Sequence, residues 1–274
     1  MHKAIITIGL AALALTSCGN YAAVQKSSDY GLKYEVAKQY FFEGKNQQAS
    51  YLLSEVVTLL KGSDRGEECL YLLGLSSLRA KDYEAASTYF KKYYETYPRG
   101  LYTEEARYQS GMALYLSTPE PKLDQTATYE ALQEFQGFIE QYPASHLRRQ
   151  AQERIFELQD KLVEKEYLNA KLYYTLGSYI GNGSNGNYQA CITTAENAIK
   201  DYPYSKRRED FAMLIVKAKF DYAKNSVASK QEERYAQAIE EYYGFRSEFP
   251  ESRHLKEAAK LYDHTPEQFK TGER

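Results

Sequence analysis

The side chains best suited to chemistry in this chain of 274 residues are three cysteines and four histidines. A thiol or an imidazole works as a nucleophile, a base or a metal ligand only when partner residues stand at suitable spacings. His146, His254 and His264 have no metal-ligand spacing to one another or to a cysteine, and the plausible thiol nucleophiles fall at packing positions of a repeated pattern. We therefore expect no catalytic residue, no metal site and no cofactor, and we predict that the protein is not an enzyme.

A glycine-rich segment from Gly181 to Gly186 has the spacing of a dinucleotide-binding loop. That motif requires a preceding strand, whereas the segment before this one has a helical pattern. We interpret it as an expanded loop between two helices.

A different chemistry is indicated at Cys18. An apolar run from Ala4 to Leu15 is too short to span a bilayer but has the length of the core of a secretion signal. The run leads into Leu15-Thr16-Ser17-Cys18, which resembles the bacterial lipoprotein box, in which the signal is cut before the cysteine and the thiol and new amino group are acylated. An ordinary signal peptide with an incidental cysteine is the alternative. We expect a signal peptide over residues 1–17 and membrane attachment through acyl chains on Cys18.

Residues 18–30 are mostly polar, and we expect them to form a lipid tether. At about 3.3 Å per residue such a segment could extend roughly 40 Å. Gly19 follows the cysteine, and by analogy with other lipoproteins an aspartate there would favour retention at the inner membrane. Its absence favours the outer membrane.

A repeated helical pattern organises the rest of the chain. Four small residues each stand twelve positions before a proline, and core-type residues follow each of them at four and seven positions. This spacing places three residues on one face of a helix. The triplets are Ala86/Phe90/Tyr93, Ala131/Phe135/Phe138, Cys191/Ala195/Ala198 and Ala238/Tyr242/Phe245, with Ala49/Leu53/Val56 as an earlier copy. Five units are predicted.

A second pattern repeats upstream in the first three units, so each unit contains two helices. Tyr34, Tyr71 and Tyr108 fall at intervals of 37 residues, and a small residue such as Gly74 follows each of them at three positions. Small residues at Gly74 and Ala86 would let the two helices of a pair approach closely. The arrangement resembles the tetratricopeptide repeat.

These patterns predict an all-α fold, a right-handed solenoid of about five tetratricopeptide-like helix pairs with a C-terminal capping helix. We expect repeats 1–3 over residues 31–145, repeats 4 and 5 with the cap over 146–262, and a flexible tail over 263–274. Such a stack leaves an extended surface of the kind that binds polypeptides. Ser145, Ser205 and Ser252 each follow a proline by two residues and are placed to cap the next helix.

Two segments depart from uniform repeats. The third unit contains an inserted loop over residues 117–126, for which partner contact and tolerated surface variation are both open. The fourth unit opens with a long helical segment from Leu147 to about Tyr179. Cys69 and Cys191 lie in separate units, and we interpret them as buried thiols. A disulfide between them is the alternative, which would require distant elements to meet.

The composition narrows the class of partner. A formal net charge of −2 shows no excess of the positive charge that nucleic-acid binding requires, so no nucleic-acid partner is expected. The chain has 28 tyrosines and no tryptophan. Tyrosine gives contact area at little entropic cost while its hydroxyl tolerates water, so this usage suits protein recognition.

Taken in order, these features resemble the BamD family of outer-membrane lipoproteins over nearly the full length. The resemblance rests on the lipoprotein box, the five units, the loop in the third unit, and the run from Lys161 to Tyr174 that follows Tyr142-Pro143-Ala144-Ser145. Two departures are Lys61-Gly62, where the family has a proline, and a longer loop over residues 181–187. These departures leave the fold intact and affect the details of partner contact.

The resemblance implies a scaffold in the machinery that folds β-barrel proteins into the outer membrane, lipid-anchored on the periplasmic face. Its N-terminal repeats would receive an extended segment of an unfolded outer-membrane protein. Its C-terminal repeats would dock onto the periplasmic domains of a barrel-forming assembly subunit, beside other assembly lipoproteins. The rival interpretation is another periplasmic tetratricopeptide lipoprotein, acting as an adaptor in cell-wall synthesis or as a pilot for a secretion channel.

Repeat geometry suggests which residues would line the receiving surface. These are Tyr34, Lys38, Phe41, Tyr71, Leu75, Leu78, Tyr108, Met112 and Tyr115. For the three in-register tyrosines, packing between helices is as good an interpretation as contact with a partner.

Overall fold

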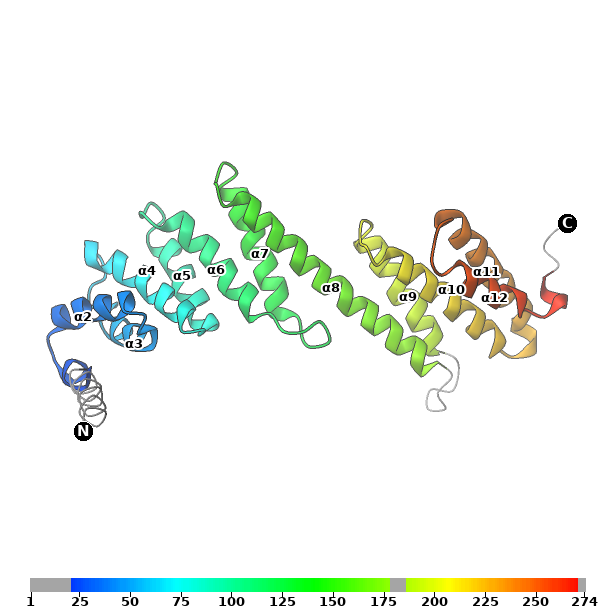
Figure 1. The fold of residues 1–274 in the computed structure, drawn as a ribbon, viewed down its shortest axis with the longest axis horizontal. Helices are drawn as coiled ribbons and strands as arrows, with labels where there is room; N and C mark the ends of the chain where they lie inside the picture. The colour runs from blue at the N-terminus through cyan, green and yellow to red at the C-terminus, as the bar shows by residue number, and fades with distance from the viewer. Residues whose placement is uncertain (1–20, 178–185, 271–274) are drawn as a thin grey trace, which may run out of the picture. The chain divides into compact units, whose positions relative to one another are not determined.

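The computed structural model describes residues 21–177 and 186–270, and Figure 1 shows their arrangement. These residues form helices and no strands. The α-helices are α2 (Tyr30–Phe42), α3 (Asn46–Val56), α4 (Asp64–Arg79), α5 (Tyr83–Thr96), α6 (Thr103–Ser117), α7 (Thr126–Gln141), α8 (Arg148–Leu176), α9 (Gly186–Asp201), α10 (Arg208–Lys224), α11 (Ala228–Glu248) and α12 (Leu255–Asp263), and a 3-10 helix, η1 (Glu267–Phe269), follows. The predicted all-α class is confirmed.

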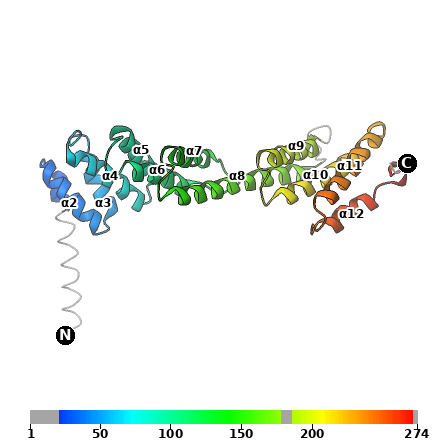
Figure 2. The same cartoon turned by 90° about the horizontal axis from the view of Figure 1, so that it is seen from above.

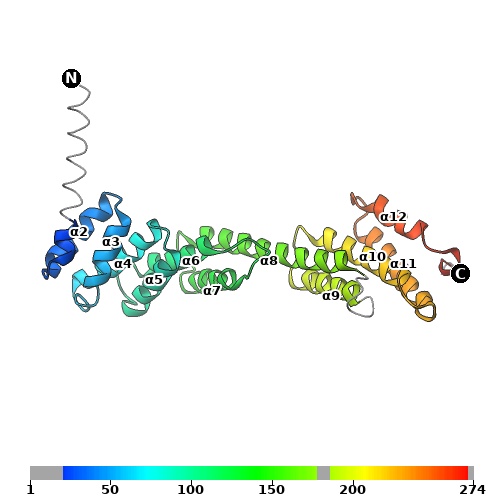
Figure 3. The same cartoon turned by 90° about the horizontal axis from the view of Figure 1, so that it is seen from below.

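The chain divides into two compact units. Of the described residues, 21–119 and 125–158 form the N-terminal unit, whereas 120–124, 159–177 and 186–270 form the C-terminal unit. The boundary falls inside α8, so each unit contains part of that helix. Within the N-terminal unit the pairs α2/α3, α4/α5 and α6/α7 follow one another (Figure 2). Within the C-terminal unit α10 packs against both α9 and α11 (Figure 3).

The repeated triplets form the core of each unit. All three members of each predicted triplet are buried, and Ala86, Phe90 and Tyr93 have no exposed surface. The glycines of the upstream pattern explain how the helices of a pair come so close. A Cβ atom at Gly74 would lie 2.7 Å from the Phe90 ring, which is closer than such atoms approach. The predicted close contact between α4 and α5 is therefore confirmed.

The aromatic-proline pairs end helices as predicted. Helices α5, α7, α9 and α11 each stop one residue before the aromatic member of the pair. Proline cannot continue the helix, because it lacks an amide hydrogen and clashes with the preceding turn.

The serines after these prolines lie two residues before the N-cap position at which we expected them to act. Each hydroxyl oxygen accepts a hydrogen bond from the amide two residues ahead: Ser145 from Leu147 at 3.0 Å, Ser205 from Arg207 at 3.0 Å and Ser252 from His254 at 2.9 Å. The helices that follow begin one residue after those amides. The serines therefore shape the turn that leads into each helix, and do not stand at the N-cap position itself.

The segment before α2 packs onto the first repeat. Residues 21–26 are helical, and Tyr21 and Val24 lie against the core formed by α2, α3 and α4. The Lys33 ammonium group donates a hydrogen bond to the Gln25 carbonyl at 2.9 Å. Part of the segment from which we expect a tether is thus held against the fold.

The long helix predicted in the fourth unit is present as α8, Arg148–Leu176. Cys18, the signal segment 1–17 and most of the loop over residues 181–187 lie outside the described residues, as does the end of the tail. Across residues 21–177 and 186–270, every helix is too short or too polar to cross a membrane.

Candidate functional site

The nine residues predicted for the receiving surface fall into two groups. Tyr34, Phe41, Tyr71 and Tyr108 are buried, and Tyr34 keeps only 1% of its surface exposed. The other five are partly exposed, and we call them the rim residues. They are Lys38, Leu75, Leu78, Met112 and Tyr115.

Tyr34 connects the first repeat to the second. Its hydroxyl donates a hydrogen bond to the Glu68 carboxylate on α4, and the Lys38 ammonium group pairs with the same carboxylate at 2.8 Å. Burial, together with the hydrogen bond to Glu68, raises the pKa of the Tyr34 hydroxyl. The hydroxyl therefore stays protonated and acts as a fixed donor.

Tyr71 belongs to a cluster of aromatic rings in the second repeat. Its ring stacks on that of Tyr102, with centroids 4.3 Å apart and planes 5° from parallel, and meets Phe90 and Tyr93 edge-on. The Tyr93 hydroxyl donates to Glu67 at 2.5 Å. Offset and edge-on ring pairs of this kind stabilise cores beyond their buried area.

Tyr108 repeats this arrangement in the third unit. Its ring lies 5.8 Å from that of Phe135 and 5.6 Å from that of Phe138, and its hydroxyl donates to Gln150 on α8 at 3.2 Å. The three in-register tyrosines are thus packing residues, and the hydroxyls of Tyr34 and Tyr108 also reach the next repeat. Any part that they and the rim residues have in binding a partner stays a prediction.

Sequence reasoning did not identify a groove that the N-terminal unit forms between α5, α6 and α7. It has a volume of about 490 Å³ and is lined by Ser87, Lys91, Tyr94, Arg107, Leu114, Glu130, Gln133 and Glu134. We call it the N-terminal groove. Tyr94 donates to Glu134 Oε1 at 2.8 Å, and the Arg107 guanidinium lies over the Tyr94 ring, 5.1 Å from its centroid.

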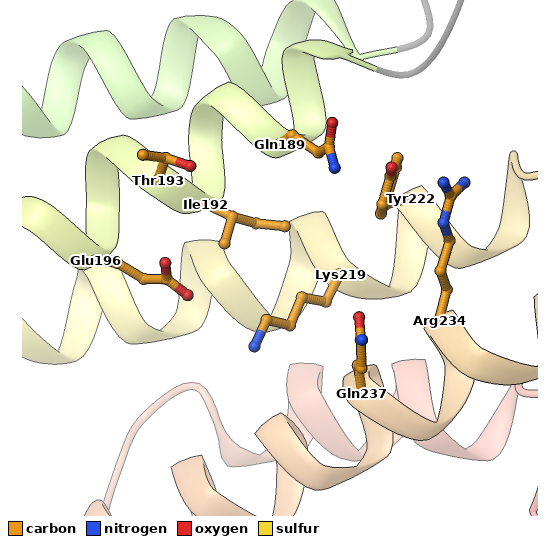
Figure 4. A pocket seen from close by; sticks show the side chains of 8 residues that line it. All are labelled: Gln189, Ile192, Thr193, Glu196, Lys219, Tyr222, Arg234 and Gln237. Carbon is orange, nitrogen blue, oxygen red and sulfur yellow. The ribbon is translucent and has the colours of Figure 1, made fainter. Parts of the chain in front are cut away.

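The C-terminal unit forms a similar groove between α9, α10 and α11. It has a volume of about 500 Å³ and is lined by Gln189, Ile192, Thr193, Glu196, Lys219, Tyr222, Arg234 and Gln237, as Figure 4 shows. We call it the C-terminal groove. Lys219 pairs with Glu241 on α11 at 2.5 Å, and the Arg234 guanidinium covers the Tyr222 ring at 3.9 Å.

The two grooves occupy equivalent places in the repeat. Lys91 and Glu196 each stand five residues after the small residue of their triplet, and Glu130 and Gln237 each stand one residue before theirs. These equivalent positions can be read from the sequence. The polar contacts across each groove cannot, because they depend on how neighbouring helices align.

A charged cluster in the C-terminal unit joins three helices. Asp210 on α10 accepts hydrogen bonds from Arg207 at 2.9 Å and from Arg253 at 2.6 Å, and lies 3.1 Å from the His254 ring. Arg207 also pairs with Glu164 on α8 at 2.7 Å. Burial opposes ionisation of Asp210, but the hydrogen bonds from these three partners outweigh it and lower the pKa of that carboxyl to about 2. Asp210 is therefore a carboxylate at neutral pH.

The two described cysteines are separate buried thiols. Neither takes part in a disulfide. Burial raises the pKa of Cys69 to about 12 and that of Cys191 to about 12, so both are protonated at neutral pH and poorly nucleophilic. Within the described part of the chain, no three His, Cys, Asp or Glu residues are placed to hold a metal ion.

Comparison of the sequence with curated proteins gives no match. Two crystal structures of nearly identical TPR-like repeats from a Podosopora anserina putative kinesin light chain are similar to this chain at 12% identity and a TM-score of 0.32. The similarity covers 80% of this chain and 95% or 96% of those chains. With so low a TM-score it supports no conclusion about this chain.

A comparison with protein families gives a firmer result. The family YfiO, described as outer membrane lipoprotein, matches residues 28–182, which is more than half of the chain. The matched residues include the whole run of helices from α2 to α8. With its helix-pair repeats, the chain belongs to the YfiO family of outer membrane lipoproteins, the BamD family that its sequence resembles.

Proposed function

We propose that this protein is a non-enzymatic scaffold of the machinery that assembles β-barrel proteins in the outer membrane. Acyl chains on Cys18 would hold it at the periplasmic face of that membrane. Its N-terminal repeats would receive unfolded barrel proteins. Its C-terminal repeats would bind the periplasmic domains of the barrel-forming subunit, and other assembly lipoproteins would share the complex.

The observation that carries this proposal is the family match over residues 28–182. That range holds the helix pairs α2/α3, α4/α5 and α6/α7, which are the repeats proposed to receive a substrate. Stacked helix pairs bury their apolar faces against each other and leave long surfaces for polypeptides. The partly exposed rim of Lys38, Leu75, Leu78, Met112 and Tyr115 is the proposed contact surface.

Affinity purification tests the proposal directly. Tagged protein would be recovered from detergent-solubilised envelopes, and its partners would be identified by mass spectrometry. We expect an outer-membrane barrel protein with periplasmic domains, together with further lipoproteins. Recovery of cell-wall synthesis enzymes or of a secretion channel in their place would contradict the proposal and favour another class of lipoprotein adaptor.

The anchor has a separate test. Replacing the proposed lipid-bearing residue, Cys18→Ser, should leave a protein that separates from the outer-membrane fraction and lacks the mass of added acyl chains. Membrane association unchanged by this substitution would show that attachment does not depend on the thiol.

A further inference from the structure

We propose that the N-terminal groove binds the backbone amides of an extended, uncharged polypeptide strand, with Arg107 as the donor and Glu134 as the acceptor. This inference deepens the proposed function, from which it takes the kind of partner, an unpaired strand of a barrel protein. It assigns that strand a second contact between α5, α6 and α7, in addition to the rim residues and sharing none of them.

The first argument is that two charged side chains of the groove carry unused hydrogen-bonding atoms. Arg107 donates through Nη1 to Gln141, and Glu134 accepts through Oε1 from Tyr94. The Arg107 Nε atom and the Glu134 Oε2 atom are buried, and neither has a hydrogen-bond partner among the described residues. Buried polar groups without partners are rare in folded proteins, so a pair of them in one groove calls for a binding partner.

The second argument is chemical complementarity. Arg107 Nε–H requires an acceptor and Glu134 Oε2 requires a donor. A peptide amide offers both, through its C=O and N–H groups. A carboxylate or phosphate ligand offers only acceptors when ionised, and an ammonium group offers only donors. The Glu134 carboxylate can turn toward a ligand at small cost, because rotation about its last torsion is broad.

The third argument concerns charge. The lining includes two cations, Lys91 and Arg107, and two anions, Glu130 and Glu134. Their formal charges cancel, so the groove has no net attraction for an anion or a cation. Lys91 and Glu130 are exposed and make no hydrogen bond or ion pair with other described residues. They can therefore pair with the polar groups of a bound segment.

The fourth argument is that the guanidinium is held in place before binding. Residue 137 is glycine, and a Cβ atom there would lie 2.5 Å from Arg107 Nη2, so the guanidinium lies directly against α7. It also lies over the Tyr94 ring, 5.1 Å from the ring centroid, and donates to Gln141. A donor that is already positioned loses little entropy when its partner arrives.

The C-terminal groove provides the internal contrast. Lys219 in that groove pairs at 2.5 Å with Glu241, which stands three residues after the small residue of its triplet, as Glu134 does. Arg234 rests on the Tyr222 ring and also donates to Ser226. Both cations of that groove therefore have partners, and none of its lining atoms is buried without a hydrogen-bond partner. The N-terminal groove differs in holding two buried polar atoms that have none.

An unpaired strand is the polypeptide that best fits these requirements. It displays alternating N–H and C=O groups along an edge, which other proteins capture by pairing with the backbone. The ring face of Tyr94 and the apolar side chain of Leu114 provide contact for the uncharged side chains of such a strand.

Peptide binding to the purified protein tests the assignment. The probe is a fluorescein-labelled peptide of alternating valine and threonine, blocked at both ends, with an N-methylated version of the same sequence as control ligand. We expect saturable binding of the probe and weak binding of the N-methylated version, which lacks amide donors. Glu134→Gln removes the acceptor and Arg107→Lys keeps the charge but removes Nε, and each should weaken binding roughly tenfold.

Glu241→Gln, at the partner of Lys219 in the C-terminal unit, is the matched control and should leave the affinity for the probe unchanged. Thermal unfolding by circular dichroism would check that each variant is folded. The inference is overturned if Glu134→Gln and Arg107→Lys bind the probe as the unaltered protein does, if Glu241→Gln loses as much affinity, if both peptides bind equally, or if no saturable binding occurs.

The envelope purification separates this inference from the proposed function. If a barrel subunit is recovered but the groove variants bind the probe normally, the groove assignment fails and the function stands. If the groove variants lose the probe but no barrel subunit is recovered, the groove binds strands and the proposed assembly role fails.

Discussion

The two units build the same helix-pair repeat but differ in the weight of charged contacts between helices. In the N-terminal unit, tyrosine hydroxyls reach carboxylates of an adjoining repeat, as Tyr34 does with Glu68, which also pairs with Lys38, and as Tyr94 does with Glu134. The C-terminal unit also has such a contact, from Tyr174 to Asp221, and adds a cluster of ion pairs with Asp210 at its centre. The apolar triplets are equivalent in both. The repeat therefore fixes the packing positions and leaves the polar connections free to vary.

This difference has a consequence for how each unit responds to substitution. A tyrosine hydroxyl is neutral, so losing one of its hydrogen bonds leaves no buried charge without a partner. Removing one member of an ion-pair cluster does leave such charges, and the cost is larger.

The largest effect is expected at Asp210. Asp210→Ala would remove the acceptor shared by Arg207, Arg253 and His254, and would separate α10 from the turn before α12. We expect the free energy of unfolding of the C-terminal unit to fall by about 3 kcal/mol, measured by urea denaturation followed by circular dichroism. Asp201→Ala, at an exposed residue of α9, is the control and should change stability by less than about 0.5 kcal/mol. Equal effects in the two variants would contradict the role given to the cluster.

The same cluster predicts a pH dependence. The folded-state pKa of Asp210, about 2, lies below the ordinary aspartate value of about 3.9, so its stabilising contribution is complete above that ordinary value. The contribution is lost as the pH falls through about 4 toward about 2. The difference in stability between the unaltered protein and Asp210→Ala should shrink over this interval by on the order of 2.5 kcal/mol. A difference that stays constant down to pH 2 would show that the carboxylate gains nothing from its partners.

The close approach of α4 and α5 gives the next prediction. Gly74→Leu would press a side chain into the Phe90 ring, and we expect a loss of about 2 kcal/mol in the free energy of unfolding. Gly244→Leu is the matched control in the C-terminal unit, because a Cβ atom there meets nothing within 4 Å. It should leave stability unchanged or raise it by up to about 1 kcal/mol, since leucine favours a helix more than glycine does. A loss in both variants would point to an effect of leucine alone.

The sequence predicted the parts of the fold that depend on the helical period. Triplets such as Ala86/Phe90/Tyr93 are buried as expected, and α8 has the predicted position and length. Periodicity works here because each repeat buries the same face against its neighbour. From the same pattern, packing and partner contact were equally good interpretations of Tyr34, Tyr71 and Tyr108. Their burial shows that they pack between helices.

The polar site could not be predicted in the same way. Each contact of the Asp210 cluster joins residues up to 44 positions apart in the chain, on helices whose relative alignment the helical period does not determine. The site proposed in the N-terminal groove depends on two buried atoms, Arg107 Nε and Glu134 Oε2, that have no hydrogen-bond partner. No spacing rule distinguishes Glu241, which forms an ion pair, from Glu134, which stands at the same repeat position with one oxygen unpartnered.

The smallest effect should appear where a tyrosine hydroxyl is removed. Tyr34→Phe keeps the buried ring of the first repeat and deletes only the donor to Glu68, which keeps Lys38 as a partner. Because the remaining carboxylate stays paired, we expect a loss of about 1 kcal/mol in the free energy of unfolding. Tyr30→Phe, at a residue with 46% of its surface exposed, is the control and should be neutral. If Tyr34→Phe cost as much as Asp210→Ala, the hydroxyl-carboxylate pairs would be as important as the charged cluster, and the contrast between the units would be lost.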